Sequence, residues 1–289
     1  MPTTMRPVAP LACVALVSLC GLLGAACDFG TLDSLSKEEA AAGGEEATLQ
    51  ARALWKFYDK GSDDTVKRAI DGVDGVIERL GELPVQVTIG DLTKEDLELV
   101  GKTADPGVAQ GMLLVTDIDC SLDQVTKLVV AKNQTTLYPG LYDVYARTYV
   151  TSVQDFLTGK TPTVIWKTNY TSSAIDRTYE AVLTGGVRLV PNANPHGGAV
   201  LLSRAVLDAP GKFIKGDDAE SNQDYQIELY FEIEPRKVRH FYGVWREFRI
   251  AGLTAESDLY INLVLGNLKD FDVRSSKLCR DGNPVATYE

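Results

Sequence analysis

The sequence lacks the residue groupings on which several kinds of catalytic and metal chemistry depend. It has only two histidines, and none of its five cysteines forms a C-x-x-C pair, so no usual set of zinc ligands is present. It has no G-x-S-x-G segment, which holds the nucleophile in many serine hydrolases, and no glycine-rich loop of the kind that cradles phosphates. We therefore expect no metal, no cofactor and no residue with a catalytic signature.

Positive charge is also scarce. The chain has 29 Lys and Arg against 40 Asp and Glu, which gives a formal net charge of −11. Nucleic-acid binding depends on clustered cations that displace counterions from phosphates, and electrostatic docking on anionic lipid headgroups depends on a similar excess. This balance argues against both functions, and we interpret the acidity as a contribution to solubility.

Residues 8–26, after the positively charged Arg6, form an uncharged run that is too short for a good membrane-spanning helix. Its core, from Leu11 to Leu23, has the length of the hydrophobic region of a secretion signal. Residues 24–26, Gly-Ala-Ala, then supply the small side chains that a signal peptidase needs. The pattern predicts a signal peptide over residues 1–26.

Residues 23–27, with the sequence LGAAC, resemble the lipobox of bacterial lipoproteins, although Gly24 stands where that family prefers leucine. The resemblance implies that Cys27 carries a lipid after cleavage and that the membrane is therefore a partner of the chain. It implies a place in the bacterial cell envelope, on the periplasmic side of the inner membrane or at the outer membrane. The alternative is ordinary cleavage after Ala26, which gives a secreted protein with a free thiol at Cys27. Residence in the cytosol is the least favoured.

The other cysteines form an even number once the leader is removed. Cys13 and Cys20 leave with the signal peptide, and Cys27 takes the lipid, which leaves Cys120 and Cys279. In an oxidising compartment such a pair predicts a disulfide. The alternative is two separate buried thiols.

Composition and hydrophobic periodicity divide the rest of the chain into three parts. Residues 27–47 are acidic and rich in small side chains, which predicts a flexible tether. Residues 48–106 contain helical patterns, most clearly over 62–80, and we expect a helical segment that packs on the main domain. Residues 107–289 form that main domain.

Strand patterns predominate in the main domain. Capping-box spacing predicts a short helix after Thr93, just before the domain, and another after Ser121. We expect loops over 191–198 and 211–224, and a long helix over 257–278. The expected strands are residues 111–120, 142–153, 161–171, 178–190, 199–208, 225–234 and 238–250. Successive strands with short links indicate an antiparallel meander, so the predicted fold class is α+β.

This order of elements resembles that of the START-like, or SRPBCC, superfamily with its helix-grip fold. The resemblance runs from Gly111 to Cys279 and is carried by LLVTDIDCSLDQVTKLV, by the meander, and by the helix after REFRIAGLTAESD. It implies an antiparallel sheet of about seven strands curved around the long C-terminal helix, here with an extra N-terminal helical segment. It also implies that the space between sheet and helix holds a hydrophobic or amphipathic small molecule without catalysis.

Alternation along residues 238–250 brings His240, Tyr242 and Arg246 to one otherwise apolar face of the sheet. Together with Trp166, they are the candidate ligand-binding residues. Each has a structural alternative. His240 is then a hydrogen-bonded core histidine, and Trp166 is ordinary core.

Arg246 has its own alternative, a salt bridge with Glu228, Glu232 or a helix carboxylate in place of a ligand carboxylate or phosphate. On the preceding strand we expect Ile227, Leu229 and Phe231 to face the same core as His240.

Two other functions stay open. One is a structural or interaction module with a solid core, for which the sequence names no protein partner. The other is an enzyme of the cyclase or hydrolase sort, which requires His240, Tyr242 and Arg246 to converge in an open cleft.

Overall fold

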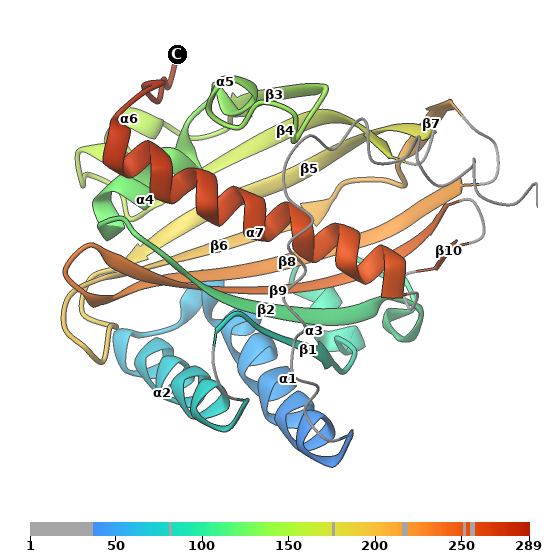
Figure 1. Cartoon of the computed structure of the whole chain (residues 1–289), viewed down its shortest axis with the longest axis horizontal. Helices are drawn as coiled ribbons and strands as arrows, with labels where there is room; N and C mark the ends of the chain where they lie inside the picture. Colours follow the sequence, from blue (N-terminus) through green and yellow to red (C-terminus); the bar gives the residue numbers. More distant parts are fainter. Residues whose placement is uncertain (1–36, 81–82, 175–176, 216–218, 251–252, 255–257) are drawn as a thin grey trace, which may run out of the picture. The chain divides into compact units, whose positions relative to one another are not determined.

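The computed structural model describes residues 37–80, 83–174, 177–215, 219–250, 253–254 and 258–289 (Figure 1). The signal peptide, Cys27 and the first part of the expected tether lie outside these residues. Among the helices within the described ranges, none has an apolar stretch long enough to cross a bilayer. The elements are α1 (Lys37–Lys60), α2 (Asp63–Leu80), β1 (Val85–Ile89), α3 (Lys94–Glu98), η1 (Pro106–Val108), β2 (Gln110–Ile118), α4 (Leu122–Val130), α5 (Gln134–Leu137), β3 (Val144–Tyr149), α6 (Val153–Leu157), β4 (Thr163–Ala174), β5 (Arg177–Val190), β6 (Val200–Leu207), β7 (Lys212–Lys215), β8 (Ala219–Glu234), β9 (Lys237–Ile250), β10 (Leu253–Thr254) and α7 (Asp258–Asp281).

One antiparallel sheet contains all ten of these strands, in the order β1-β2-β9-β8-β6-β5-β4-β3 with β10 beside β9 and β7 beside β5. The α+β class, the antiparallel meander and the long C-terminal helix are confirmed, and α7 lies across one face of the sheet (Figure 1). The expected count of about seven strands is too low. The extra strands are β1, β7 and β10, and the loop expected over 211–224 instead contains β7 and the start of β8.

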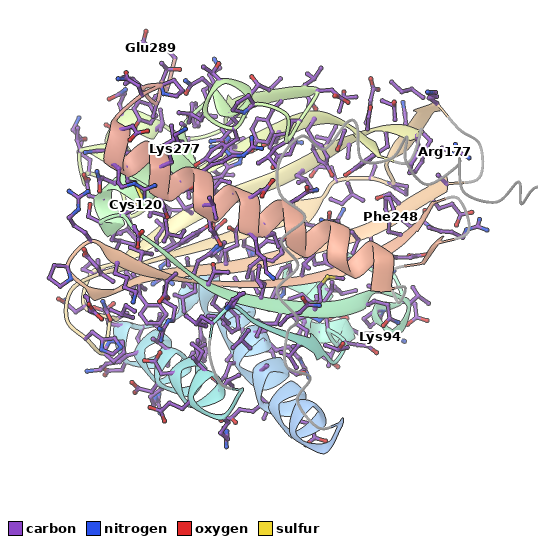
Figure 2. The ribbon with its side chains drawn as sticks, in the orientation of Figure 1. Lys94, Cys120, Arg177, Phe248, Lys277 and Glu289 are labelled. Atoms are coloured by element: carbon purple, nitrogen blue, oxygen red, sulfur yellow. A yellow bond between two sulfur atoms is a disulfide. The ribbon has the colours of Figure 1, made fainter. Side chains whose placement is uncertain are left out.

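The helices α1 and α7 cover opposite faces of the sheet. Trp55 of α1 packs edge to face on Tyr225 of β8 and Trp245 of β9, whereas Asp272 of α7 contacts His240, which lies on the other face of β9. Side chains accordingly fill the layers on both sides of the sheet (Figure 2). The sheet is therefore the middle of three layers, which is why β8 and β9 are buried on both faces.

The boundaries expected for the N-terminal part are wrong in two respects. Helix α1 begins at Lys37, so residues 37–47 are helix and not flexible tether. The reason is packing against β1, because Ala47 is fully buried and a Cβ on Gly44 would lie only 2.7 Å from the Thr88 carbonyl oxygen. The segment 48–106 is also not wholly helical, since β1 lies within it and pairs with β2.

Several local predictions at helix ends are confirmed. Both capping boxes form, from Thr93 with Asp96 at α3 and from Ser121 with Gln124 at α4. A further cap comes from the sheet. The guanidinium of Arg188 on β5 donates hydrogen bonds to three carbonyl oxygens at the C-terminal end of α1, those of Phe57, Tyr58 and Gly61.

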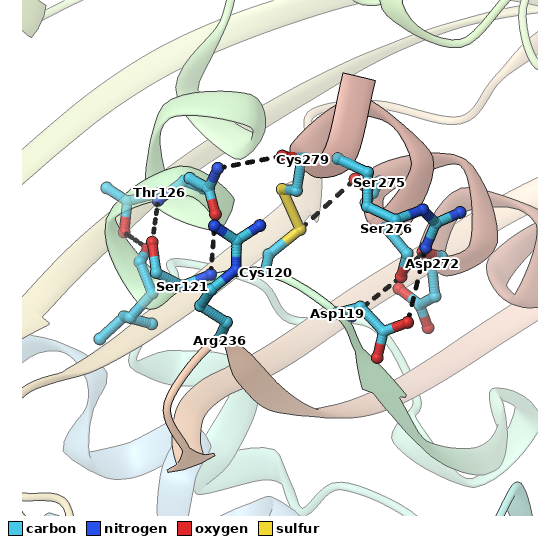
Figure 3. The surroundings of a disulfide bond; sticks show 12 residues. Asp119, Cys120, Ser121, Thr126, Arg236, Asp272, Ser275, Ser276 and Cys279 are labelled. Carbon is cyan, nitrogen blue, oxygen red and sulfur yellow. Dashed lines mark hydrogen bonds and ion pairs between the residues drawn. A yellow bond between two sulfur atoms is a disulfide. The ribbon is translucent and has the colours of Figure 1, made fainter. Parts of the chain in front are cut away.

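A disulfide joins Cys120, just after β2, to Cys279 in the last turn of α7, as expected (Figure 3). Hydrogen bonds reinforce this corner. The Asp119 amide donates to the Ser276 hydroxyl over 3.0 Å, and the Gln124 side-chain amide donates to the Cys279 carbonyl oxygen over 3.2 Å. The C-terminal end of α7 is thus fixed to the sheet by both covalent and polar bonds.

Candidate functional site

A cavity with a volume of about 240 Å³ lies between the sheet and α7. Strands β3 to β6, β8 and β9 supply most of its wall, and α7 contributes Leu268 and Phe271. Small residues help to keep it open, because Gly185 and Ala205 stand side by side beneath Trp166 where larger side chains would fill the space. The four residues predicted from the sequence, Trp166, His240, Tyr242 and Arg246, all line it.

Strand β8 turns its polar side, and not its apolar side, toward this cavity. The register pairs Tyr230 with His240 and Glu228 with Tyr242, so the even-numbered residues of β8 share the cavity face. The expectation that Ile227, Leu229 and Phe231 face the same core as His240 is therefore wrong. They are fully buried on the opposite face, which α1 covers. The prediction assumed one core, whereas the sheet has a core on each side.

His240 is the centre of a buried polar network. Its side chain is only 1% exposed, with Nδ1 2.9 Å from Asp272 Oδ1 and Nε2 3.3 Å from Glu228 Oε2. Thr116 donates its hydroxyl hydrogen to Asp272, and the Tyr230 ring stacks on the imidazole with centroids 4.3 Å apart. The network links β2, β8, β9 and α7.

The charges in this network stabilise one another. Burial by itself lowers the pKa of His240, but the charges and hydrogen bonds of Asp272 and Glu228 outweigh burial and raise that pKa to about 9. Burial raises the pKa of Glu228, but the hydrogen bond and charge of His240 outweigh it, and that pKa lies below its ordinary value. The geometry therefore holds an imidazolium between two carboxylates. Since both ring nitrogens face carboxylates, His240 is poorly suited to accept a proton from a substrate.

Arg246 forms a salt bridge, but with a carboxylate that the sequence reasoning did not consider. Its guanidinium Nη2 lies 2.7 Å from Asp224 Oδ2, and neither Glu228 nor Glu232 is its partner in that bond. The antiparallel register explains the choice, because Asp224 on β8 stands directly opposite Arg246 on β9. His240 and Arg246 thus pair with different carboxylates and do not form one catalytic group.

Four tyrosines outside the candidate set also line the cavity wall. Tyr142, Tyr145, Tyr170 and Tyr179 line it with Tyr242, and the Tyr170 and Tyr179 hydroxyls lie 3.0 Å apart. Burial raises the pKa of Tyr170 and of Tyr179, so both phenols stay neutral donors and acceptors at ordinary pH. No short sequence pattern joins these tyrosines, because they come from the loop before β3 and from β3, β4 and β5.

Sequence reasoning also missed Arg147, which lines the cavity although it is only 5% exposed. Its guanidinium lies over the Trp166 ring, 4.0 Å from the centroid, so Trp166 supports a cation from within the wall. Within the described residues, no group of three or more His, Cys, Asp or Glu is arranged to hold a metal ion. The site offers aromatic surface, neutral phenols and paired charges.

Known proteins resemble the chain only at the level of fold. No protein-family model matches it, and neither does any curated protein. A START superfamily protein from Mycobacterium smegmatis is 11% identical, with a TM-score of 0.37, over 58% of this chain and 98% of that one. The human StAR-related lipid transfer protein 5 is 10% identical, with a TM-score of 0.39, over 63% and 79%.

An aromatase/cyclase from Streptomyces sp. R1128 is also similar in structure. It is 8% identical, with a TM-score of 0.36, over 60% of this chain and 94% of that one. At identities this low the likeness concerns the fold alone, so the role of the cavity is argued from its own residues.

Proposed function

We propose that the protein is held in the bacterial cell envelope by a lipid on Cys27 and binds a compact amphipathic molecule in the cavity, without catalysis. The observation that carries the binding proposal is the cavity of about 240 Å³ between the sheet and α7. Its wall combines aromatic rings with a few fixed polar groups, which is the usual composition of a small-molecule site.

The volume limits the size of the ligand. A dry cavity of about 150 Å³ is enough to bind benzene, and drug-sized ligands occupy roughly 300–1,000 Å³. The cavity here lies between these two limits. A molecule with one or two rings, or a short chain, fits it better than a complete membrane lipid does.

The wall also bears on the two alternative functions. A structural module with a solid core would not contain the space that Gly185 and Ala205 leave open. An enzyme needs a free acid or base, whereas His240 is enclosed by Asp272 and Glu228. Both features favour a binding site.

The binding proposal is tested by filling the cavity. Ala205 lines it, so we expect Ala205→Phe to abolish retention of small molecules by the purified full-length chain, measured by solvent extraction and mass spectrometry. The matched control is Ala146→Phe, because Ala146 is exposed on β3. If the wild-type chain retains nothing, or if Ala205→Phe retains the same compound as Ala146→Phe, this cavity is not the binding site.

The anchor proposal rests on cysteine usage. The disulfide accounts for Cys120 and Cys279, and Cys27 follows the small residues of a signal. We expect Cys27→Ser to release the protein from membranes and to remove a lipid-sized mass from its N-terminus. If the variant stays membrane-bound and the N-terminal mass differs only by the substitution, the anchor proposal is wrong. Secretion after ordinary cleavage predicts that wild type and variant are both soluble.

A further inference from the structure

Arg147 is a buried cation whose surroundings neutralise it only in part. Its Nη1 donates hydrogen bonds to the carbonyl oxygens of Val129 and Ala131, at the C-terminal end of α4, and Nη2 donates to the Tyr145 hydroxyl. The partial negative charge at a helix C-terminus and the Trp166 ring both stabilise the guanidinium. No ion pair joins Arg147 to a carboxylate in the part of the chain that the structure describes.

The hydrogen-bond donors of Arg147 are not all used. A guanidinium has five N–H groups, and three donate to the partners just named. The Nε–H is buried and makes no hydrogen bond to the described residues, and Nη2, which has two N–H groups, has only the Tyr145 hydroxyl as a partner among them. Nε and Nη2 share one edge of the planar guanidinium, and such an edge can bind a carboxylate through two parallel hydrogen bonds.

Within the described residues, other arginines form salt bridges with carboxylates, which Arg147 does not. Arg246 pairs with Asp224, Arg204 pairs with Asp59 and Arg239 pairs with Asp117. Among the arginines that the structure describes, Arg147 alone combines near-complete burial, a place in the cavity wall and a buried N–H with no acceptor. Leaving such a donor unpaired is unfavourable, and a ligand oxygen would relieve it.

We propose that the ligand is an organic acid whose carboxylate is bound by Nε and Nη2 of Arg147, while its apolar part lies against the aromatic side chains of the cavity. The inference deepens the proposed function and rests on it. The phenols of the cavity wall then contact the rest of the molecule, and Trp166 holds the guanidinium plane in place.

The test compares two probes of equal size that differ only in the charged group. These are naphthalene carboxylate and naphthalene methanol, substituted at the same ring position. Binding is measured by isothermal titration calorimetry on the full-length chain, kept soluble by an amphipathic polymer too large to enter the cavity. We expect the carboxylate to bind about ten- to a hundredfold more tightly, the usual range for hydrogen bonds to a charged group.

Two arginine variants separate a ligand contact from a structural one. In Arg147→Met the preference for the carboxylate is lost, whereas the alcohol binds as before. The matched control is Arg188→Met, because Arg188 also donates to carbonyls at a helix C-terminus but does not line the cavity. We expect Arg188→Met to keep the preference for the carboxylate over the alcohol. If Arg147→Met does not fold, Arg147→Lys retains the cation without the planar edge, and we expect a preference below wild type.

The outcomes distinguish this inference from the function on which it rests. If the wild-type chain binds the alcohol as tightly as the carboxylate, or if Arg147→Met or Arg147→Lys keeps the full preference, Arg147 only caps α4 and the inference is wrong. The cavity nevertheless binds ligands in that case. If neither probe binds to wild type while Ala205→Phe and Ala146→Phe behave alike, the proposed function fails as well.

Discussion

The two faces of the sheet are built on different principles. On the face covered by α1, the side chains of Trp55, Leu229, Phe241 and Trp245 are fully buried and pack with aromatic rings edge to face. On the face covered by α7, buried apolar side chains are joined by buried polar ones such as His240, and a cavity lies among them. The same strands, β8 and β9, contribute to both faces.

The difference indicates how one sheet can be both stable and hollow. Apolar side chains collapse until no space remains, because the burial of apolar area is non-directional. Polar side chains that bond to one another are held by directional bonds and cannot move into a neighbouring space without losing them. The α1 face is therefore close-packed, whereas the network around His240 holds part of the other face in an open form.

The largest loss of stability is expected when the disulfide that fixes α7 to the sheet is removed. The disulfide closes a loop with a sequence separation of 159 residues. In the loop-entropy model, removing it in the double variant Cys120→Ala/Cys279→Ala lowers the free energy of unfolding by about 5 kcal/mol. Urea unfolding measures this, with Cys27→Ala as the control that changes a cysteine without changing the loop. A loss below about 1 kcal/mol would show that α7 does not depend on this bond.

The second largest loss of stability tests whether the face of the sheet covered by α1 is close-packed. Trp55→Ala removes a fully buried ring and its Nε1–H hydrogen bond to the Asp96 carbonyl oxygen. We expect the free energy of unfolding to fall by about 4 kcal/mol, because the rigid surroundings cannot fill the space. Leu49→Ala on the same helix is the control, since Leu49 is 64% exposed, and we expect a change within about 0.5 kcal/mol. Equal effects of the two variants would contradict a solid core under α1.

The contrast between the faces also explains what could be predicted from the sequence. Hydrophobic period and capping chemistry are local, so α2, both capping boxes, the meander and α7 were predictable from short stretches. The short strands β7 and β10 carry little local signal, and β1 was hidden in a segment that we interpreted as helical. Their strand form depends on pairing with distant partners.

The site was predictable only in part, for the same reason. All four candidate residues line the cavity, because alternation along a strand fixes which side chains share a face. The partner of Arg246 was not predictable, since it follows from the register of β8 on β9. Arg147 was missed because a single arginine in a strand normally indicates a solvated side chain, and only the packing of α4 and β4 buries it.

The third effect concerns the pH dependence of the α7 face. The pKa of His240 in the folded protein is about 9, above its ordinary value of 6.5. Its contribution to stability is therefore complete below pH 6.5 and is lost as the pH rises through 9. We expect the free energy of unfolding to fall by roughly 3 kcal/mol across this window, measured by urea unfolding at a series of pH values.

The control for this pH dependence is His240→Gln, which removes the titrating ring. The variant is less stable than wild type at pH 7 because it leaves Glu228 and Asp272 buried without a cation, and its pH curve lacks the decline centred on the His240 pKa. Parallel pH curves for wild type and variant would place the titration elsewhere. At acid pH the stability depends on a different group, Glu228. The pKa of Glu228 is lowered, so its contribution is present above its ordinary value of 4.5 and declines as the pH falls.

The smallest effect tests whether polar pairs hold the cavity wall in place. The Tyr170 and Tyr179 hydroxyls bond to each other, so Tyr170→Phe leaves the half-buried Tyr179 hydroxyl without this partner. We expect a loss of about 1 kcal/mol in the free energy of unfolding for either single variant. The double variant Tyr170→Phe/Tyr179→Phe removes both hydroxyls and should be less destabilised than the sum of the two, because no donor is left unpaired. Strictly additive losses in this double-mutant cycle would show that the two hydroxyls act independently, and the wall would then owe its shape to packing, as the α1 face does.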